Sequence, residues 1–172
     1  LLQMATTDVQ SFMAYRHHTW FVQSLLPLQV QTTTAVKLKQ NGVYVIIGGA
    51  GGIGGVWSEY LVKTYQAQVI WIGRRPLDEK IQAKIDQIGI LGPSPLYFSA
   101  DASDRLRLAT VIAYIKQQFP SIHGVIHSAI DLKDQSILRM ELETFQASLK
   151  AKVTTSLYVY ELFKEETLDF ML

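Results

Sequence analysis

A run of glycines in the segment GVYVIIGGAGGIGGVW, residues 42–57, constrains the fold of this chain more than any other feature of its sequence. Val43–Ile47 is an unbroken apolar segment, which is typical of a strand buried on both faces. Six glycines follow between positions 48 and 55, and residues 58–62 then have the composition of a helix. Because glycine lets the backbone approach a ligand and a helix start offers free N–H groups, this order of elements predicts a site for the phosphates of a nucleotide.

The spacing of the glycines narrows the class of nucleotide site. Gly48, Gly52 and Gly54 fit the pattern G-x-x-x-G-x-G of short-chain dehydrogenases and reductases better than the tighter G-x-G-x-x-G. No Gly-Lys-Ser or Gly-Lys-Thr follows, so the sequence does not indicate a P-loop NTPase. A glycine turn with a purely structural role is the alternative. On the first interpretation, the residues that hold the cofactor are Gly48, Gly49, Gly51, Gly52, Ile53 and Gly54.

Composition excludes several other classes of function. The 172 residues carry a net charge of +1, from 16 basic and 15 acidic side chains, so no nucleic-acid-binding surface is expected. The chain has no cysteine, which excludes a disulfide scaffold and fits a cytoplasmic protein. The uncharged residues 42–57 are too few and too rich in glycine for a membrane span. The chain starts at Leu1 and stops in mid-pattern at Leu172, so we expect a piece of a longer protein.

Beyond the glycines, strands and helices alternate along the chain. Apolar runs predict further strands at 68–72, 96–100, 124–127 and 168–172. Helices are expected at 76–88, at 103–119 with Ser103 as its cap, and at 142–163. This alternation predicts an α/β fold, a Rossmann-type doubly wound parallel sheet that is incomplete at its C-terminus.

Residues 1–40 stand apart from this alternation. Two short strands are predicted on either side of His17 and His18, and a polar linker at 29–40. Adjacent histidines suggest a metal, but neighbouring side chains on a strand point to opposite faces and no cluster of ligands follows. We therefore favour a surface turn and expect no metal site. The predicted division of the chain is 1–40 and 41–172.

Two arginines end the second strand of the nucleotide-binding part. In a dinucleotide fold this strand end faces the adenosine ribose, where an acidic side chain binds the 2′-hydroxyl of NAD and an arginine suits the 2′-phosphate of NADP. Residues 73–75 are Gly-Arg-Arg, without an acid. Arg74, the stronger candidate, and Arg75 therefore favour NADP. The alternative is a pair of solvated surface charges.

Further candidates lie at the ends of the third and fourth strands. Asp101 could accept a hydrogen bond from the adenine amino group, or cap a turn. Ser128 and Ala129 lie beside the expected position of the nicotinamide ribose. His127 suggests acid–base chemistry, but a lone histidine at a buried strand end is more often packed and hydrogen-bonded, and we favour that role.

The long predicted helix carries a lysine on the face that is expected to pack inward. Regular helix geometry places Lys152 within this face and Lys150 elsewhere. Lys152 then either packs its stem while its ammonium reaches solvent, or places a cation beside a cofactor, and helix geometry leaves both open. The other residues of the face are Phe145, Leu149, Val153, Ser156, Leu157 and Tyr160.

Six segments, taken in order, resemble the ketoreductase domains of modular polyketide synthases, a branch of the short-chain dehydrogenases and reductases. The resemblance extends over nearly the whole chain, and several motifs in one order are more specific than any single motif. The segments are Tyr15-Arg16 with Leu25-x-Pro27, GVYVIIGGAGGIG at 42–54, WIGRR at 71–75, ADA at 100–102, GVIHSA at 124–129 and LKAKV at 149–153.

The resemblance implies NADPH-dependent reduction of the β-keto group of an acyl chain on an acyl carrier protein. It adds Ala102 to the cofactor site and matches Lys152 to the family's catalytic lysine. It makes residues 1–40 the end of the family's structural subdomain and 41–172 the N-terminal part of its NADP-binding catalytic subdomain. The implied partners are the carrier protein, a β-ketoacyl thioester and other synthase domains. Whether the parent protein is a dimer is left open. The family's catalytic serine and tyrosine would follow Leu172, so this chain alone is not expected to reduce a ketone.

Three positions depart from the family's pattern. Ile47 replaces a threonine whose hydroxyl ties the turn to neighbouring backbone, Ile130 replaces a glycine near the nicotinamide, and Thr155 replaces a glycine after the lysine. Residues 132–134, Leu-Lys-Asp, keep only the last acid, Asp134, of the Leu-Asp-Asp motif that the family associates with D-configured (B-type) alcohols, so a D-configured product is only weakly favoured. Two alternatives therefore remain: a non-catalytic NADP-binding scaffold, and a free-standing short-chain reductase, against which the N-terminal 40 residues count.

Overall fold

The computed structural model describes residues 12–24, 26–27 and 38–172. The chain divides into two units, Leu1–Ala35 and Val36–Leu172, and each is described by itself. In the first unit, β1 (Met13–Arg16) and β2 (Thr19–Val22) pair antiparallel. His17 and His18 form the turn with φ of 47° and 62°, which suits a tight hairpin and confirms the predicted strands and turn. Most of the predicted linker at 29–40 lies outside the described residues.

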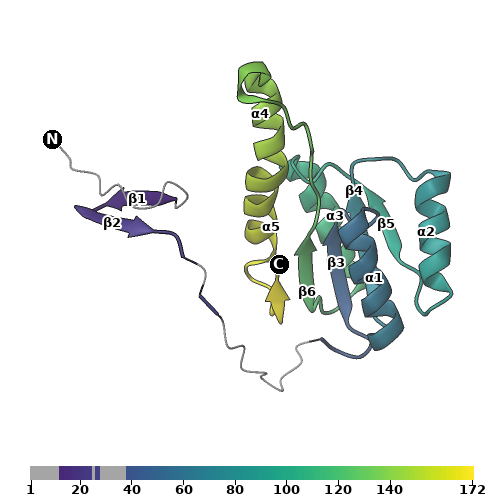
Figure 1. The fold of residues 1–172 in the computed structure, drawn as a ribbon. Helices are drawn as coiled ribbons and strands as arrows, with labels where there is room; N and C mark the ends of the chain where they lie inside the picture. Colours follow the sequence, from purple (N-terminus) through teal and green to yellow (C-terminus); the bar gives the residue numbers. More distant parts are fainter. Residues whose placement is uncertain (1–11, 25, 28–37) are drawn as a thin grey trace. The chain divides into compact units, whose positions relative to one another are not determined.

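The second unit is built on five parallel strands in the order β5-β4-β3-β6-β7 (Figure 1). The strands are β3 (Val43–Ile47), β4 (Gln68–Gly73), β5 (Leu96–Ser99), β6 (Gly124–His127) and β7 (Phe170–Met171). The chain moves outward from β3 to one edge and then returns to the other side of β3, so the order reverses between β3 and β6. Ligands bind at the carboxyl ends of the strands at such a reversal. The predicted fold class is confirmed.

Helices cover both faces of this sheet (Figure 1). One core lies between the sheet and α1 (Gly52–Tyr65) with α2 (Glu79–Gly89), and the other between the sheet and α3 (Arg105–Gln118) with the last helix. The cap of α3 is Asp104, which accepts the N–H groups of Leu106 and Arg107, so the prediction of Ser103 as the cap was wrong. None of the helices in the described residues has the length and apolarity that a bilayer crossing requires.

The predicted helix at 142–163 is divided by a wide turn. It consists of α4 (Leu142–Leu149), a π-helical turn η2 (Lys150–Thr154) and α5 (Thr155–Phe163). The predicted inward face is wrong: Phe145, Leu149, Val153, Leu157 and Tyr160 are 43–58% exposed, and Ser156 is exposed as well. Thr155, Val159 and Phe163 are the buried residues of α5. A π-turn holds more residues than an α-turn, so a face extended at the regular α-helical angle goes out of phase across it.

Candidate cofactor-binding site

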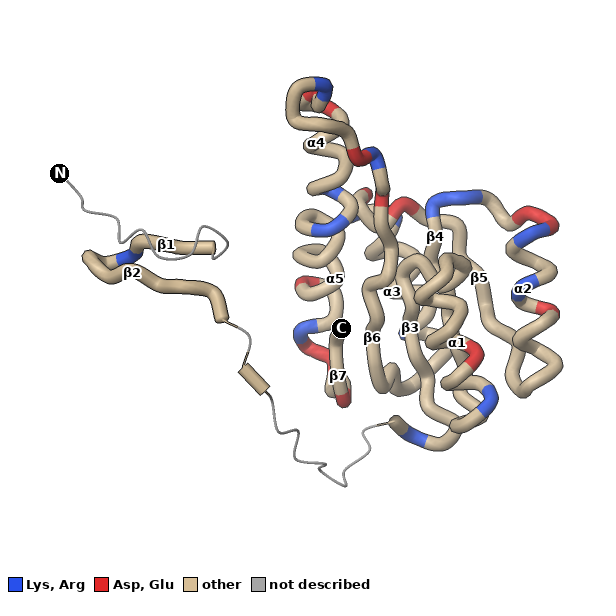
Figure 2. The backbone as a smooth tube through the Cα atoms, in the orientation of Figure 1, with Lys and Arg blue, Asp and Glu red and all other residues tan. Residues whose placement is uncertain are grey.

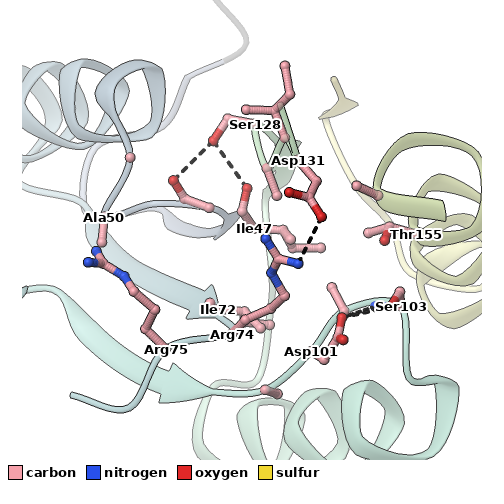
Figure 3. Close-up of a pocket in the computed structure, with 18 of the residues that line it drawn as sticks. Ile47, Ala50, Ile72, Arg74, Arg75, Asp101, Ser103, Ser128, Asp131 and Thr155 are labelled. Carbon is pink, nitrogen blue, oxygen red and sulfur yellow. Dashed lines mark hydrogen bonds and ion pairs between the residues drawn. The ribbon is translucent and has the colours of Figure 1, made fainter. Parts of the chain in front are cut away.

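A cavity of about 650 Å³ lies at the carboxyl ends of β3, β4, β5 and β6 (Figure 3). The loops after these four strands and the middle of the last helix form its walls. Ten residues that the sequence predicted for a cofactor site line it together: Gly48, Gly51, Gly52, Ile53, Arg74, Arg75, Asp101, Ala102, Ser128 and Ala129. The structure thus brings together residues that are up to about 80 positions apart in the sequence.

The glycine turn leaves the start of α1 uncapped beside the cavity. The helix begins at Gly52, earlier than the predicted residue 58, and its N-cap Gly51 offers no side chain. In an α-helix the first N–H groups, here those of Gly52, Ile53 and Gly54, have no intrahelical partner. The helix dipole adds positive potential at the same end, so this helix start suits an anion such as a pyrophosphate.

Gly49 and Gly54 belong to the turn but do not line the cavity. A Cβ on Gly49 would overlap the ring of Trp71, and a Cβ on Gly54 would lie 2.5 Å from the carbonyl oxygen of Gly48. The fully buried Trp71 cannot move aside easily, because its Nε1 donates to Ser58 Oγ at 2.7 Å. These two glycines therefore let the turn pack closely on the protein itself.

The turn is tied to the neighbouring strand by a serine. The hydroxyl of Ser128 lies 3.1 Å from the carbonyl oxygen of Ile47 and 3.3 Å from that of Gly48 (Figure 3). The backbone N–H of Ser128 also donates to the Ile47 carbonyl at 2.9 Å. Ile47 is itself buried in the core, where its side chain fills apolar space. The tie that was expected to be lost at Ile47 is thus supplied from the end of β6.

The cavity wall carries four cations and two carboxylates. The sequence pointed to Arg74, Arg75 and Asp101, but not to Asp131, Lys133 or Lys150. Lys150 lines the cavity, so its expected direction away from the site was wrong. Figure 2 shows basic residues at the end of β4 and along the last helix. An excess of positive charge around an uncapped helix start favours a ligand with several phosphates.

Asp101 caps the loop after β5. Its Oδ1 accepts the N–H of Ser103 at 2.9 Å and the hydroxyl of Ser103 at 2.8 Å. Partial burial by itself would raise the pKa of Asp101, but these hydrogen bonds and the charges of Arg74 and Lys150 lower it overall. Asp101 is therefore an ionised acceptor on the cavity wall, and it has the turn-capping role that the sequence left open.

His127 is packed against the π-turn of the last helix. Its Nε2 lies 3.0 Å from the carbonyl oxygen of Ala151, so this nitrogen carries the proton. The π-turn frees carbonyl groups from the regular helix ladder, and the hydroxyl of Thr155 donates to the carbonyl oxygen of Lys150 at 3.4 Å. Burial, followed by the charge of Lys152, lowers the pKa of His127 despite the hydrogen bond to Ala151. A neutral, packed histidine agrees with the role favoured from the sequence.

Lys152 lies on the exposed side of the π-turn. It is outside the lining of the cavity, but its positive charge lowers the pKa of His127. The argument that placed it on the inward face of a regular helix does not hold, because that face is exposed. Its catalytic role therefore rests on the family motif alone and stays a prediction.

A doubly wound parallel sheet with a G-x-x-x-G-x-G turn at its point of reversal defines a Rossmann-type fold of the short-chain dehydrogenase/reductase class. The family model of the KR domain matches residues 42–172. The chain belongs to this family, the ketoreductase domains of polyketide synthases. Domains of this family depend on a nicotinamide cofactor, and their activity is that of an oxidoreductase.

Two curated relatives are polyketide synthases of Bacillus subtilis (strain 168). The chain is 44% identical to polyketide synthase PksM over 92% of its length and 44% identical to PksN over 100%, but it spans only 4% and 3% of those proteins. A solved structure, an N-terminal ketoreductase from the macrolactin assembly line, superposes with a TM-score of 0.77 at 34% identity. That comparison covers 89% of this chain and 30% of the solved one.

Proposed function

We propose that this chain forms the cofactor-binding part of an NADPH-dependent ketoreductase that reduces the β-keto group of an intermediate on an acyl carrier protein. One observation carries the choice of cofactor: Arg74 and Arg75 line the same cavity as the uncapped start of α1, and no acidic residue ends β4. An acid at this strand end would favour NAD, whereas a guanidinium can bind the 2′-phosphate of NADP through two parallel hydrogen bonds.

Each wall of the cavity has a part in this binding. The N–H groups at Gly52 and Ile53 hold the pyrophosphate, and Arg74 binds the 2′-phosphate with Arg75 beside it. Asp101 accepts from the adenine amino group through an oxygen that Ser103 does not use. Ser128 and Ala129 lie beside the nicotinamide ribose. NADPH supplies the hydride for the reaction, and Lys152 orients the ribose and the proton-donating tyrosine of the parent enzyme.

The relatives support the proposed partners. Polyketide synthases are multidomain proteins, which supports a β-ketoacyl thioester on a carrier protein as the substrate and other synthase domains as neighbours. Residues 1–40 are then the end of the structural subdomain and 41–172 the start of the catalytic one. We place this activity in the cytoplasm, in agreement with a chain that has no cysteine.

Replacing Arg74 with aspartate in the full-length protein tests the choice of cofactor. We expect the affinity for NADPH to fall by about 10- to 100-fold, because a hydrogen bond to a charged group contributes about 1.5–3 kcal/mol. The affinity for NADH should change much less, since NADH has no 2′-phosphate. Dissociation constants for both cofactors, measured by nicotinamide fluorescence, give the result.

Arg139→Asp is the matched control. Arg139 is exposed and lies outside the cavity lining, so the same reversal of charge there should leave both dissociation constants nearly unchanged. Equal losses of NADPH and NADH affinity in Arg74→Asp would argue against the assignment of Arg74 to the 2′-phosphate.

A further inference from the structure

An ion pair crosses the cavity that we assign to NADPH. Arg74 follows β4 and Asp131 follows β6, and β3 lies between these two strands. The Nη1 of Arg74 nevertheless reaches the Oδ2 of Asp131, at 3.3 Å (Figure 3). The side chain of Arg74 therefore extends over the carboxyl end of β3 and its glycine turn, where a dinucleotide would lie.

Asp131 is the inner member of this pair. Its side chain is 16% exposed, whereas those of Arg74 and Lys133 are 57% and 49% exposed. The same Oδ2 lies 3.7 Å from the Nζ of Lys133. One carboxylate oxygen thus attracts two of the four cations on the cavity wall, and it offsets positive charge that would otherwise attract an anionic ligand.

We propose that Asp131 is an internal counter-ion that competes with the 2′-phosphate of NADPH for Arg74, and so limits the preference of the site for NADPH over NADH. This inference rests on the proposed function. Arg74 cannot direct its guanidinium both to Asp131 across the cavity and fully to a phosphate beside β4. NADPH binding therefore has to break this ion pair, and the negative charge of Asp131 on the same cavity wall opposes the binding of a phosphate.

The opposite role, in which Asp131 orients Arg74 for the phosphate, fits the geometry less well. Orientation by a carboxylate usually involves a guanidinium held by two parallel hydrogen bonds of about 2.7–2.9 Å. Here a single nitrogen meets a single oxygen at 3.3 Å. Such a contact restrains the direction of the guanidinium weakly, while the charge of Asp131 still reduces the attraction of Arg74 for another anion.

Asp131→Asn in the full-length protein tests this competition, because it removes the charge and nearly preserves the shape. We expect NADPH to bind roughly three to ten times more tightly, as a partly exposed ion pair and a repulsion are both removed. NADH should change by less than about twofold, since it carries no phosphate at this position. In an Arg74→Gln background, Asp131→Asn should change NADPH affinity much less than it does alone.

Asp134→Asn is the matched control, because it removes the same charge three residues further along the same loop and outside the cavity lining. It should leave both affinities nearly unchanged. Unchanged or weaker NADPH binding in Asp131→Asn, or equal tightening of both cofactors, would overturn the inference. The cofactor preference of the unaltered protein separates the two proposals. If the unaltered protein does not prefer NADPH over NADH, the proposed function itself is contradicted. If it does prefer NADPH, a negative result with Asp131→Asn contradicts only the inference about Asp131.

Discussion

Replacing Lys152 with alanine in the full-length protein is expected to lower the rate of ketone reduction by about 100-fold or more, because a positioned group that assists proton transfer contributes at least this factor. The affinity for NADPH should fall much less than the rate, since Lys152 lies outside the lining of the cavity and only orients a cofactor that other residues hold. The fold should be retained too, because the side chain is exposed. Turnover of a β-ketoacyl thioester and NADPH affinity, measured on the same preparation, give both results.

Lys150→Ala is the matched control for this substitution. Lys150 is the neighbouring lysine of the same π-turn, but it lines the cavity and its charge lowers the pKa of Asp101. We expect Lys150→Ala to weaken cofactor binding modestly and to keep most of the turnover at saturating NADPH. The reverse pattern, with turnover lost in Lys150→Ala and kept in Lys152→Ala, would assign the catalytic lysine to position 150. An unaltered protein that binds NADPH without reducing any ketone would favour the scaffold alternative.

Gly54→Ala is expected to destabilise the fold and to disturb the cofactor site together. The new methyl group would lie 2.5 Å from the Gly48 carbonyl oxygen and 2.6 Å from the Gly49 Cα, and backbone atoms cannot move aside as a side chain can. Overpacking of this kind costs about 1–3 kcal/mol of unfolding free energy. Any relaxation must displace the turn that presents the helix start to the cavity. Urea denaturation and a titration with NADPH measure the two effects.

Gly55→Ala provides a control one residue away in the same helix. An added Cβ at Gly55 meets nothing within 4 Å, so it creates no clash. Alanine is favoured over glycine within a helix by about 0.5–1 kcal/mol, so this variant should be at least as stable as the unaltered protein. If Gly54→Ala were as stable as Gly55→Ala, the close packing of the turn would be contradicted.

The order of strands and helices could be predicted because it depends on local patterns. The apolar run Val43–Ile47 lacks the alternation of a strand with one face in water, which is typical of a strand covered on both faces, and all five of its residues are buried. The glycines then mark where the strand ends and the helix begins, although α1 begins earlier than its composition suggested. Most of the cavity wall follows from this order, because the carboxyl ends of parallel strands meet at one edge.

The direction of the last helix could not be predicted in the same way. Its π-turn is accompanied by a hydrogen bond between His127 and Ala151, which are 24 residues apart, and by the hydroxyl of Thr155. No local pattern encodes these contacts. A face extended through a regular helix therefore placed Lys150 outside the site, although it lines the cavity.

The ionic partner of Arg74 was not predicted from the sequence, for a similar reason. Asp131 is 57 residues away, on a loop whose family resemblance drew attention to Ile130 and to residues 132–134 instead. A signal was present, because Asp131 follows a predicted strand end that meets the same edge of the sheet as Arg74. Pairing acids and bases across predicted strand ends would have identified it as a candidate.

The central claim is that the cavity between the glycine turn and Arg74 holds NADPH, and the most direct test is the ratio of two dissociation constants in the unaltered full-length protein. Titration with NADPH and NADH under the same salt conditions gives this ratio. We expect NADPH to bind at least about ten times more tightly than NADH, as hydrogen bonds from a guanidinium to a phosphate imply. Equal affinities, tighter binding of NADH, or no binding of either cofactor would contradict the claim.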